Sequence, residues 1–147
     1  MTNEAHNYAN LLVRLERFEE AKSLLCKLMP VARRVLGEGN LITLWFMSTY
    51  AESLYSDPGA TLDDLREAVT TLEDAGRIAR RVFGGAHPRT VDIEDDLRDA
   101  RAAIGARETP EKLAQDAFRT ARAKLAQERS ELAKTLADAS ARPSKDT

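Results

Sequence analysis

Apolar residues recur at helical spacing along most of the chain, and no long stretch alternates apolar and polar residues with a period of two. This spacing predicts helices with one buried side, because residues three and four apart share one face of a helix. The predicted helices cover residues 3–15, 18–36, 41–55, 62–83 and 88–104, and a longer one follows them. Turns at Gly37–Asn40 and Gly84–Gly85 end the second and the fourth helix, as glycine just past a helix usually does.

The predicted helices repeat along the chain. The segment Ala32–Gly37 recurs 47 residues later as Ala79–Gly84, with one Leu replaced by Phe. Upstream, Tyr8 and the alanine after it recur 42 residues later at Tyr50. The difference falls in residues 56–61, whose Ser, Asp, Pro and Gly are typical of a loop. The unit is therefore about 42 residues long, and its second copy has a longer inner turn.

A repeat domain is predicted over residues 1–106, with repeats at about 3–40 and 41–87 and a half repeat at 88–104. A pair of helices of this size cannot bury its apolar side alone, so neighbouring pairs stack. Small side chains are expected where the helices cross closely, namely at Ala9, Ala21, Ala51, Ala68 and Ala75.

Several stretches of the two repeats together form a recognisable signature. They are Asn7-Tyr8-Ala9-x-Leu11-Leu12, Phe18-x-Glu20-Ala21-x-x-Leu24-Leu25, Arg34-Val35-Leu36-Gly37 and, in the second copy, Phe83-Gly84-x-x-His87-Pro88-x-Thr90. The pattern resembles the tetratricopeptide repeat of the kinesin light chain type over about residues 3–104. The resemblance implies an all-α fold, a short right-handed superhelical stack of helix–turn–helix repeats with a long C-terminal helix, and a peptide-binding mode.

The sequence also departs from that family. The first copy lacks the His-Pro pair, and the resemblance does not extend to the long heptad segment that joins a kinesin light chain to its motor. It therefore does not imply a motor subunit. Pro30 falls inside the second predicted helix, where a proline costs about 3 kcal/mol, so we expect a kink or a break near Met29.

The segment 107–141 is predicted to be a charged, alanine-rich helix that begins anew, with Thr109 as N-cap and Pro110 at its first position. Large apolar residues lie seven apart in it, at Phe118, Leu125 and Leu132. Two interpretations follow, a helix that caps the last repeat or a helix that pairs with a second copy or a partner. Residues 142–147 are predicted to be a disordered tail.

Composition and charge narrow the classes of partner. The net charge of −2 leaves no basic surplus of the kind that nucleic-acid binders usually carry, so we expect no nucleic acid as a partner. The longest apolar run is far short of the roughly 20 residues of a membrane span. Cys26 is the one cysteine, so no internal disulfide can form, and a reducing, cytoplasmic location is predicted.

The candidate binding residues lie on the first helix of each repeat. By the resemblance, Asn7, Thr49 and Asp96 occupy matching positions where the family often carries a peptide-binding asparagine. Asp92, Asp96 and Asp99 share one side of the helix at 88–104. If these acids face the groove, a basic peptide is the expected ligand. The alternative is that they form a solvated charged face with no partner.

The remaining candidates for metal binding or catalysis are better explained by structural roles. Acidic residues near His87 suggest a metal site, but no second His or Cys has ligand spacing, so a turn element is favoured. Trp45, Phe46 and Tyr50 are predicted to be core aromatics, and Cys26 a small buried residue. No nucleophile elbow or phosphate-binding glycine loop occurs, so we predict no catalysis, no cofactor and no metal.

The predicted function is a scaffold or adaptor that binds a partner protein or peptide through a helical-repeat surface. The alternative is a structural subunit that fills an interface in a larger stable assembly. Both leave room for a homo-oligomer.

Overall fold

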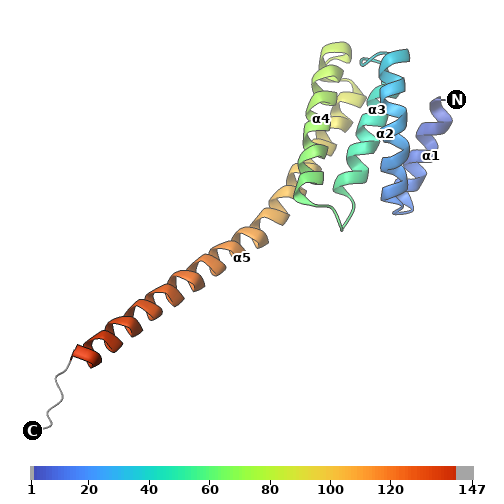
Figure 1. Ribbon diagram of the computed structural model, residues 1–147. Helices are drawn as coiled ribbons and strands as arrows, with labels where there is room; N and C mark the ends of the chain where they lie inside the picture. Colours follow the sequence, from blue (N-terminus) through green and yellow to red (C-terminus); the bar gives the residue numbers. More distant parts are fainter. Residues whose placement is uncertain (1, 142–147) are drawn as a thin grey trace, which may run out of the picture. The chain divides into compact units, whose positions relative to one another are not determined.

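The computed structural model describes residues 2–141, which form five α-helices and no strand, so the all-α prediction is confirmed (Figure 1). The helices are α1 (Thr2–Arg14), α2 (Phe18–Val35), α3 (Leu41–Tyr55), α4 (Leu62–Phe83) and the long α5 (Pro88–Ala141). The chain divides into two compact units, Met1–Arg107 and Glu108–Thr147. We call them the first and the second unit. The predicted tail at 142–147 lies outside the described residues.

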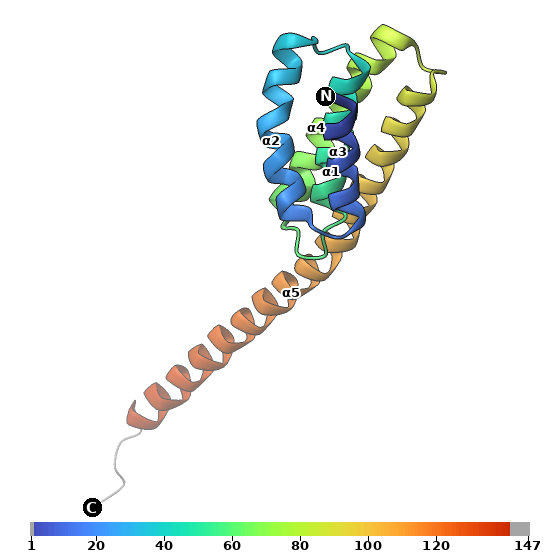
Figure 2. The ribbon, with the colours of Figure 1, turned by 90° about the vertical axis from the view of Figure 1, so that its right-hand side faces the viewer.

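Helix α3 is the centre of the first unit. It packs against α1, α2 and α4, and Figures 1 and 2 show these four helices side by side. Most of its side chains are buried, whereas α2 and α4 each bury only one side. The largest buried side chains of the unit include Leu12, Leu25, Leu44, Phe46, Met47, Leu65, Leu72 and Ile93. Since α3 is apolar nearly all round, it needs neighbours on several sides, and the pairs of helices supply them.

The alanines predicted at close helix crossings are all fully buried. Their side chains have no exposed surface at Ala9, Ala21, Ala51, Ala68 and Ala75. A larger side chain at such a position would force two helix backbones apart, because protein interiors are close-packed. Their burial is therefore confirmed, and it explains why the repeats keep alanine there.

The two glycine turns have the same geometry. Gly37 has φ of 88° and Gly84 has φ of 87°, a backbone region that side chains other than glycine rarely adopt. The hydroxyl of Thr43 donates to the Gly37 carbonyl at 2.8 Å, and the hydroxyl of Thr90 donates to the Gly84 carbonyl at 2.8 Å. The sequence repeat is therefore also a repeat of hydrogen bonds.

Different residues begin the helix after each turn. The Asn40 side chain accepts a hydrogen bond from the Ile42 backbone N–H at 2.9 Å. In the second copy, His87 Nδ1 accepts from the Arg89 backbone N–H at 3.1 Å, and its ring stacks on Phe83. Both side chains satisfy a backbone donor that a helix leaves unpaired at its start. The turn role predicted for His87 is confirmed, and Asn40 replaces it where the His-Pro pair is missing.

The first turns of α5 belong to the first unit and pack on α4. Ile93 is fully buried in the core. Two ion pairs join the helices, one between Arg80 and Glu94 and one between Arg101 and Glu73 at 2.9 Å. Exposed ion pairs of this kind contribute about 0.2–1 kcal/mol each, so the apolar contact contributes most of the stability here.

The break predicted near Met29 is wrong. Helix α2 continues through Pro30 and ends only at Val35. Apolar residues on both sides of the proline, among them Leu25 and Ala32, are buried in the core. This packing holds the helix together and offsets the loss of one backbone hydrogen bond.

The start of a new helix at Thr109 is also wrong. Helix α5 runs without interruption from Pro88 to Ala141 and contains Pro110. Thr109 is therefore an interior residue and not an N-cap. The flanking residues are mostly alanine, arginine and glutamate, which are strong helix formers. In addition, the Arg107 guanidinium donates to the backbone carbonyls of Pro58, at 2.6 Å, and Ala60, which holds this part of α5 against the loop after α3.

The burial predicted for Cys26 is wrong as well. Its side chain is exposed, although Leu25 beside it is fully buried. Successive residues of a helix are about 100° apart, so the neighbour of a core residue can face water.

The second unit is described over residues 108–141, where it is a single stretch of helix and every residue is exposed. Its large apolar side chains are 60–71% exposed, and they are Leu113, Phe118, Leu125, Leu132 and Leu136. The second unit therefore has no core among its described residues.

Candidate protein-binding surface

Three side chains from three helices stack at one place in the first unit. The His6 ring of α1 lies 4.8 Å from the Trp45 ring of α3, with 17° between their planes. The guanidinium of Arg89, from α5, lies 5.8 Å from the centre of the Trp45 ring. All three side chains are half-buried. Trp45 is therefore partly a surface residue, whereas Phe46 and Tyr50 lie in the core as predicted.

A second group of side chains lies on two of these three helices, α3 and α5. The Tyr55 hydroxyl donates to the Asp96 carboxylate at 3.3 Å, and Glu52 lies one helical turn before Tyr55. Tyr55, Asp96 and Glu52 are half-buried. We call the surface formed by His6, Glu52, Trp45, Tyr55, Arg89 and Asp96 the α1–α3–α5 face. It combines a half-buried aromatic ring with carboxylates that are partly shielded from water.

The two carboxylates of the α1–α3–α5 face are held in an unfavourable place for negative charge. Burial raises the pKa of Asp96 to about 6, and the charge of Glu52 adds to the effect. Burial also raises the pKa of Glu52. Neither carboxylate forms an ion pair with any residue between 2 and 141. A cation brought to this place would remove part of the desolvation cost.

Arg89 is the cation whose charge acts on Asp96. Burial lowers its pKa, and the charges of Asp92 and Asp96 act in the opposite direction. Burial and the charge of Arg89 lower the pKa of His6, so the ring that stacks on Trp45 is neutral at pH 7. The guanidinium therefore lies over an aromatic ring and within range of the charges of Asp92 and Asp96, and within residues 2–141 it forms no ion pair with either carboxylate.

The residues proposed from sequence lie at different depths. Asn7, Asp92 and Asp99 are exposed, and Asp96 is half-buried. Thr49 is only 5% exposed and therefore lies in the core of the first unit rather than on its surface. The structure brings Asp96 together with the aromatic side chain of Tyr55, and it leaves Asn7 outside the α1–α3–α5 face.

Sequence reasoning missed five members of this face. They are His6, Glu52, Tyr55, Arg89 and Trp45, which was predicted to be a core residue and is half-buried. One signal was present, since Trp45, Thr49 and Glu52 follow one another at helical spacing on the first helix of the second repeat. No pattern in the sequence indicates the contacts of His6 and Arg89 with Trp45, because these contacts join residues of three different helices.

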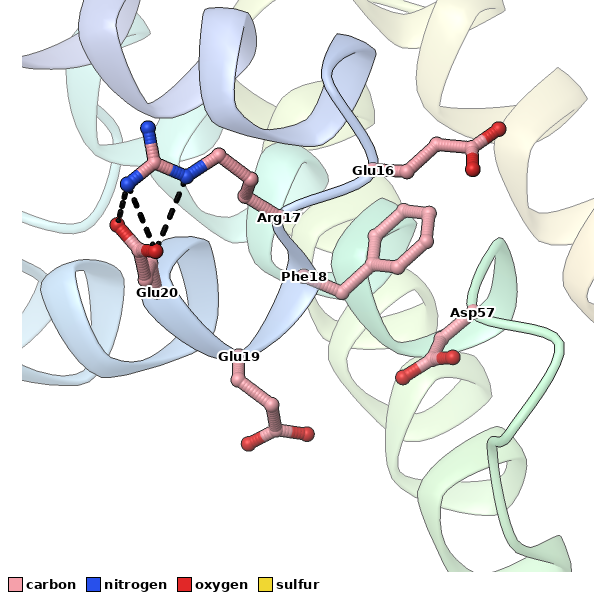
Figure 3. A pocket seen from close by; sticks show the side chains of 6 residues that line it. All are labelled: Glu16, Arg17, Phe18, Glu19, Glu20 and Asp57. Atoms are coloured by element: carbon pink, nitrogen blue, oxygen red, sulfur yellow. Dashed lines mark hydrogen bonds and ion pairs between the residues drawn. The ribbon is translucent and has the colours of Figure 1, made fainter.

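A shallow hollow of about 230 Å³ lies where α1 meets α2 (Figure 3). Figure 3 shows the Phe18 ring in it, with Glu16 and Asp57 nearby. Arg17 donates three hydrogen bonds to Glu20 beside it, at 2.6, 2.8 and 3.0 Å. The walls of this hollow are mostly exposed charged side chains, so the hollow offers little apolar surface to a ligand.

Searches of residues 2–141 for two further kinds of site gave no candidate. No helix in this range is both long and apolar enough to cross a membrane. No group of three or more His, Cys, Asp or Glu residues in the described chain is placed to hold a metal ion. Comparison of the chain with known protein families, with curated proteins and with solved structures found no match.

Proposed function

We propose that this protein is an adaptor of the tetratricopeptide kind, with its helix pairs in a right-handed superhelical stack, and that it binds a partner protein without catalysis. The equal geometry of the turns at Gly37 and Gly84 supports the repeat architecture. In such an architecture α1, α3 and the first part of α5 are the equivalent helices of successive repeats, and the α1–α3–α5 face is their shared surface.

The observation that carries the proposal is the pair of half-buried carboxylates, Glu52 and Asp96, which form no ion pair within residues 2–141 and share the α1–α3–α5 face with the half-buried ring of Trp45. A lysine or arginine of a partner would neutralise them in a place where water and salt screen charge less than at an open surface. Trp45 adds an aromatic surface on which the apolar stem of that residue, or a neighbouring side chain, can pack. The proposed ligand is therefore a segment of protein with a basic residue.

The test begins with the selection of peptides from a random phage library on the wild-type chain. The binding of the selected peptides is then measured for wild type and for two double variants. Wild type is expected to enrich peptides that contain lysine or arginine. The double variant Glu52→Gln with Asp96→Asn should bind the selected peptides about tenfold more weakly, because both carboxylates have lost their charge. The matched control is Asp116→Asn with Glu128→Gln, which removes two exposed carboxylates from the second unit and should change nothing.

Two results would contradict the proposed ligand. One is enrichment of peptides without basic residues, and the other is equal binding by the double variant and its control. Circular dichroism of each variant shows whether the helices remain, so a loss of binding can be separated from a loss of fold.

The second candidate is a structural subunit of a larger assembly. It is supported by three large apolar side chains in and directly after α1 that are about half exposed, Tyr8, Leu11 and Leu15. An obligate subunit is expected to lose its cooperative thermal transition when purified alone, whereas an adaptor should unfold in a single sharp transition. Scanning calorimetry of the isolated chain decides between the two.

A further inference from the structure

An apolar hollow of about 310 Å³ lies between α1, α2 and α3. It is lined by Ala5, Leu28, Val31, Ala32, Val35, Leu36 and Phe46. We call it the α1–α2 hollow. Phe46 is almost fully buried, whereas Val31 and Val35 are 45% and 69% exposed. Every lining side chain is apolar, which is typical of a surface that receives an apolar partner.

One wall of the α1–α2 hollow belongs to a basic stretch of chain. Between residues 21 and 37 there are four basic residues and no acidic one. Two of the four, Lys27 and Arg34, stand four residues before and three residues after Val31 on α2, so they flank its exposed side chain. Both are exposed, and neither forms an ion pair within the described part of the chain.

We propose that the α1–α2 hollow binds an amphipathic helix of a partner protein, with large apolar side chains in the hollow and acidic residues opposite Lys27 and Arg34. A helix places apolar residues three and four positions apart on one side, which suits a hollow bounded by two helices and floored by a third. Carboxylates one turn away from those apolar residues reach the two cations at its rim.

The charge of the rim favours such a partner over a second copy of this chain. A two-fold contact centred on the α1–α2 hollow would bring Lys27 and Arg34 of both copies to one interface, because a two-fold interface uses the same patch twice. Like charges facing each other across an interface are unfavourable. An acidic helix would instead be attracted by these two cations. The α1–α2 hollow shares no residue with the α1–α3–α5 face, although the His6 ring of that face lies 6.5 Å from the Phe46 ring. The proposal does not depend on the function proposed for that face.

Three synthetic peptides of about 18 residues test the proposal by fluorescence anisotropy on the whole chain. The first carries leucines at helical spacing with glutamates beside them, the second has lysines in place of the glutamates, and the third has serines in place of the leucines. The first should bind, and the other two should bind about tenfold more weakly or not at all.

Protein variants then locate the site. Val31→Asp introduces a charge at the α1–α2 hollow and should abolish binding of the glutamate peptide. Val91→Asp is the matched control, since Val91 is an exposed valine of the first unit, on α5, at 42% exposure. Reversal of both rim charges, Lys27→Glu with Arg34→Glu, should transfer the preference to the lysine peptide. Circular dichroism checks the fold of each variant.

Three results would overturn the proposal. The first is that none of the peptides binds to saturation, and the second is that Val31→Asp and Val91→Asp bind the glutamate peptide equally. The third comes from sedimentation of the protein alone. A dimer that forms with rising concentration, and that Val31→Asp abolishes, would assign the α1–α2 hollow to a second copy.

Discussion

The two units of this protein have similar helical patterns and opposite degrees of burial. Leu72, on α4 of the first unit, has no exposed surface, whereas Leu125, in the second unit, is 60% exposed. Both leucines lie in helices with apolar residues at regular spacing. The comparison teaches that periodicity shows which side of a helix is apolar, but whether that side is covered depends on neighbouring elements.

The difference determines where the stability of the protein lies. A buried leucine contributes about 1.5–3 kcal/mol by leaving water, and an exposed one contributes little of this. The first unit therefore folds through its core. The described part of the second unit depends on intrinsic helix propensity and on side-chain interactions three and four residues apart, which are worth only tenths of a kcal/mol each.

The largest expected contrast is between leucine-to-alanine changes in the two units. Leu72→Ala should lower the free energy of unfolding by about 3 kcal/mol, because it removes buried methyl groups and leaves a cavity. Leu125→Ala should change it by less than about 0.5 kcal/mol, because its side chain already meets water. Urea unfolding monitored by far-UV circular dichroism, which reports on the helices of both units, measures both.

An equal loss from the two changes would break the comparison. It would mean that Leu125 is covered in solution, through pairing of the second unit with another copy. In that case the effect of Leu125→Ala should depend on protein concentration, and the effect of Leu72→Ala should not.

Glycine changes give the next contrast, between a turn and a helix. Gly84 has φ of 87° and ψ of 161°, a conformation that is almost restricted to glycine, so Gly84→Ala should cost about 2 kcal/mol through backbone strain. Gly105 lies inside α5, and a methyl group added there meets no other atom within 4 Å. Gly105→Ala should stabilise the helix by about 0.5–1 kcal/mol.

Thermal unfolding measures both glycine changes. The matched position in the first copy is Gly37, which has φ of 88°, and Gly37→Ala should destabilise as Gly84→Ala does. If Gly37→Ala had no effect while Gly84→Ala was costly, the two turns would not be energetically equivalent. The two turns would then share a backbone geometry but not a contribution to stability.

The extent of the helices could be predicted from sequence because local signals mark their ends. Glycine turns and polar N-caps lie at both ends of α3, and α3 and α4 begin and end where they were predicted. The errors at Pro30 and Thr109 have one cause. Proline is a local signal for the end of a helix, but packing on both sides of Pro30, and strong helix formers around Pro110, overcome it.

The candidate site could be predicted only in part. The acidic side of the first turns of α5 was visible in the sequence, and Asp96 does lie on the α1–α3–α5 face. Helical spacing could not show that Tyr55 donates to Asp96, since this hydrogen bond joins residues 41 positions apart. Likewise, the burial of Thr49 follows from the position of α3 between other helices, which a single sequence does not specify.

The smallest expected contrast concerns two aspartates and the pH dependence of stability. The pKa of Asp96 is about 6 in the folded protein and near 3.9 in an unfolded chain, so the folded state binds the proton more tightly. Stability should therefore fall as pH rises from about 4 to 6 and stay lower above that range. Because Asp96 is only partly buried, solvent screening limits the loss to about 1 kcal/mol.

Asp96→Asn should remove this fall and should leave the protein about 1 kcal/mol more stable than wild type at pH 7, because asparagine stays neutral and can still accept from Tyr55. Asp116→Asn, at an exposed position of the second unit, is the control and should follow the wild-type curve. Urea unfolding at intervals between pH 4 and 7 gives the three curves. Parallel curves for wild type and Asp96→Asn would show that water reaches Asp96 freely, and the argument for a cation-binding place on the α1–α3–α5 face would lose its electrostatic basis.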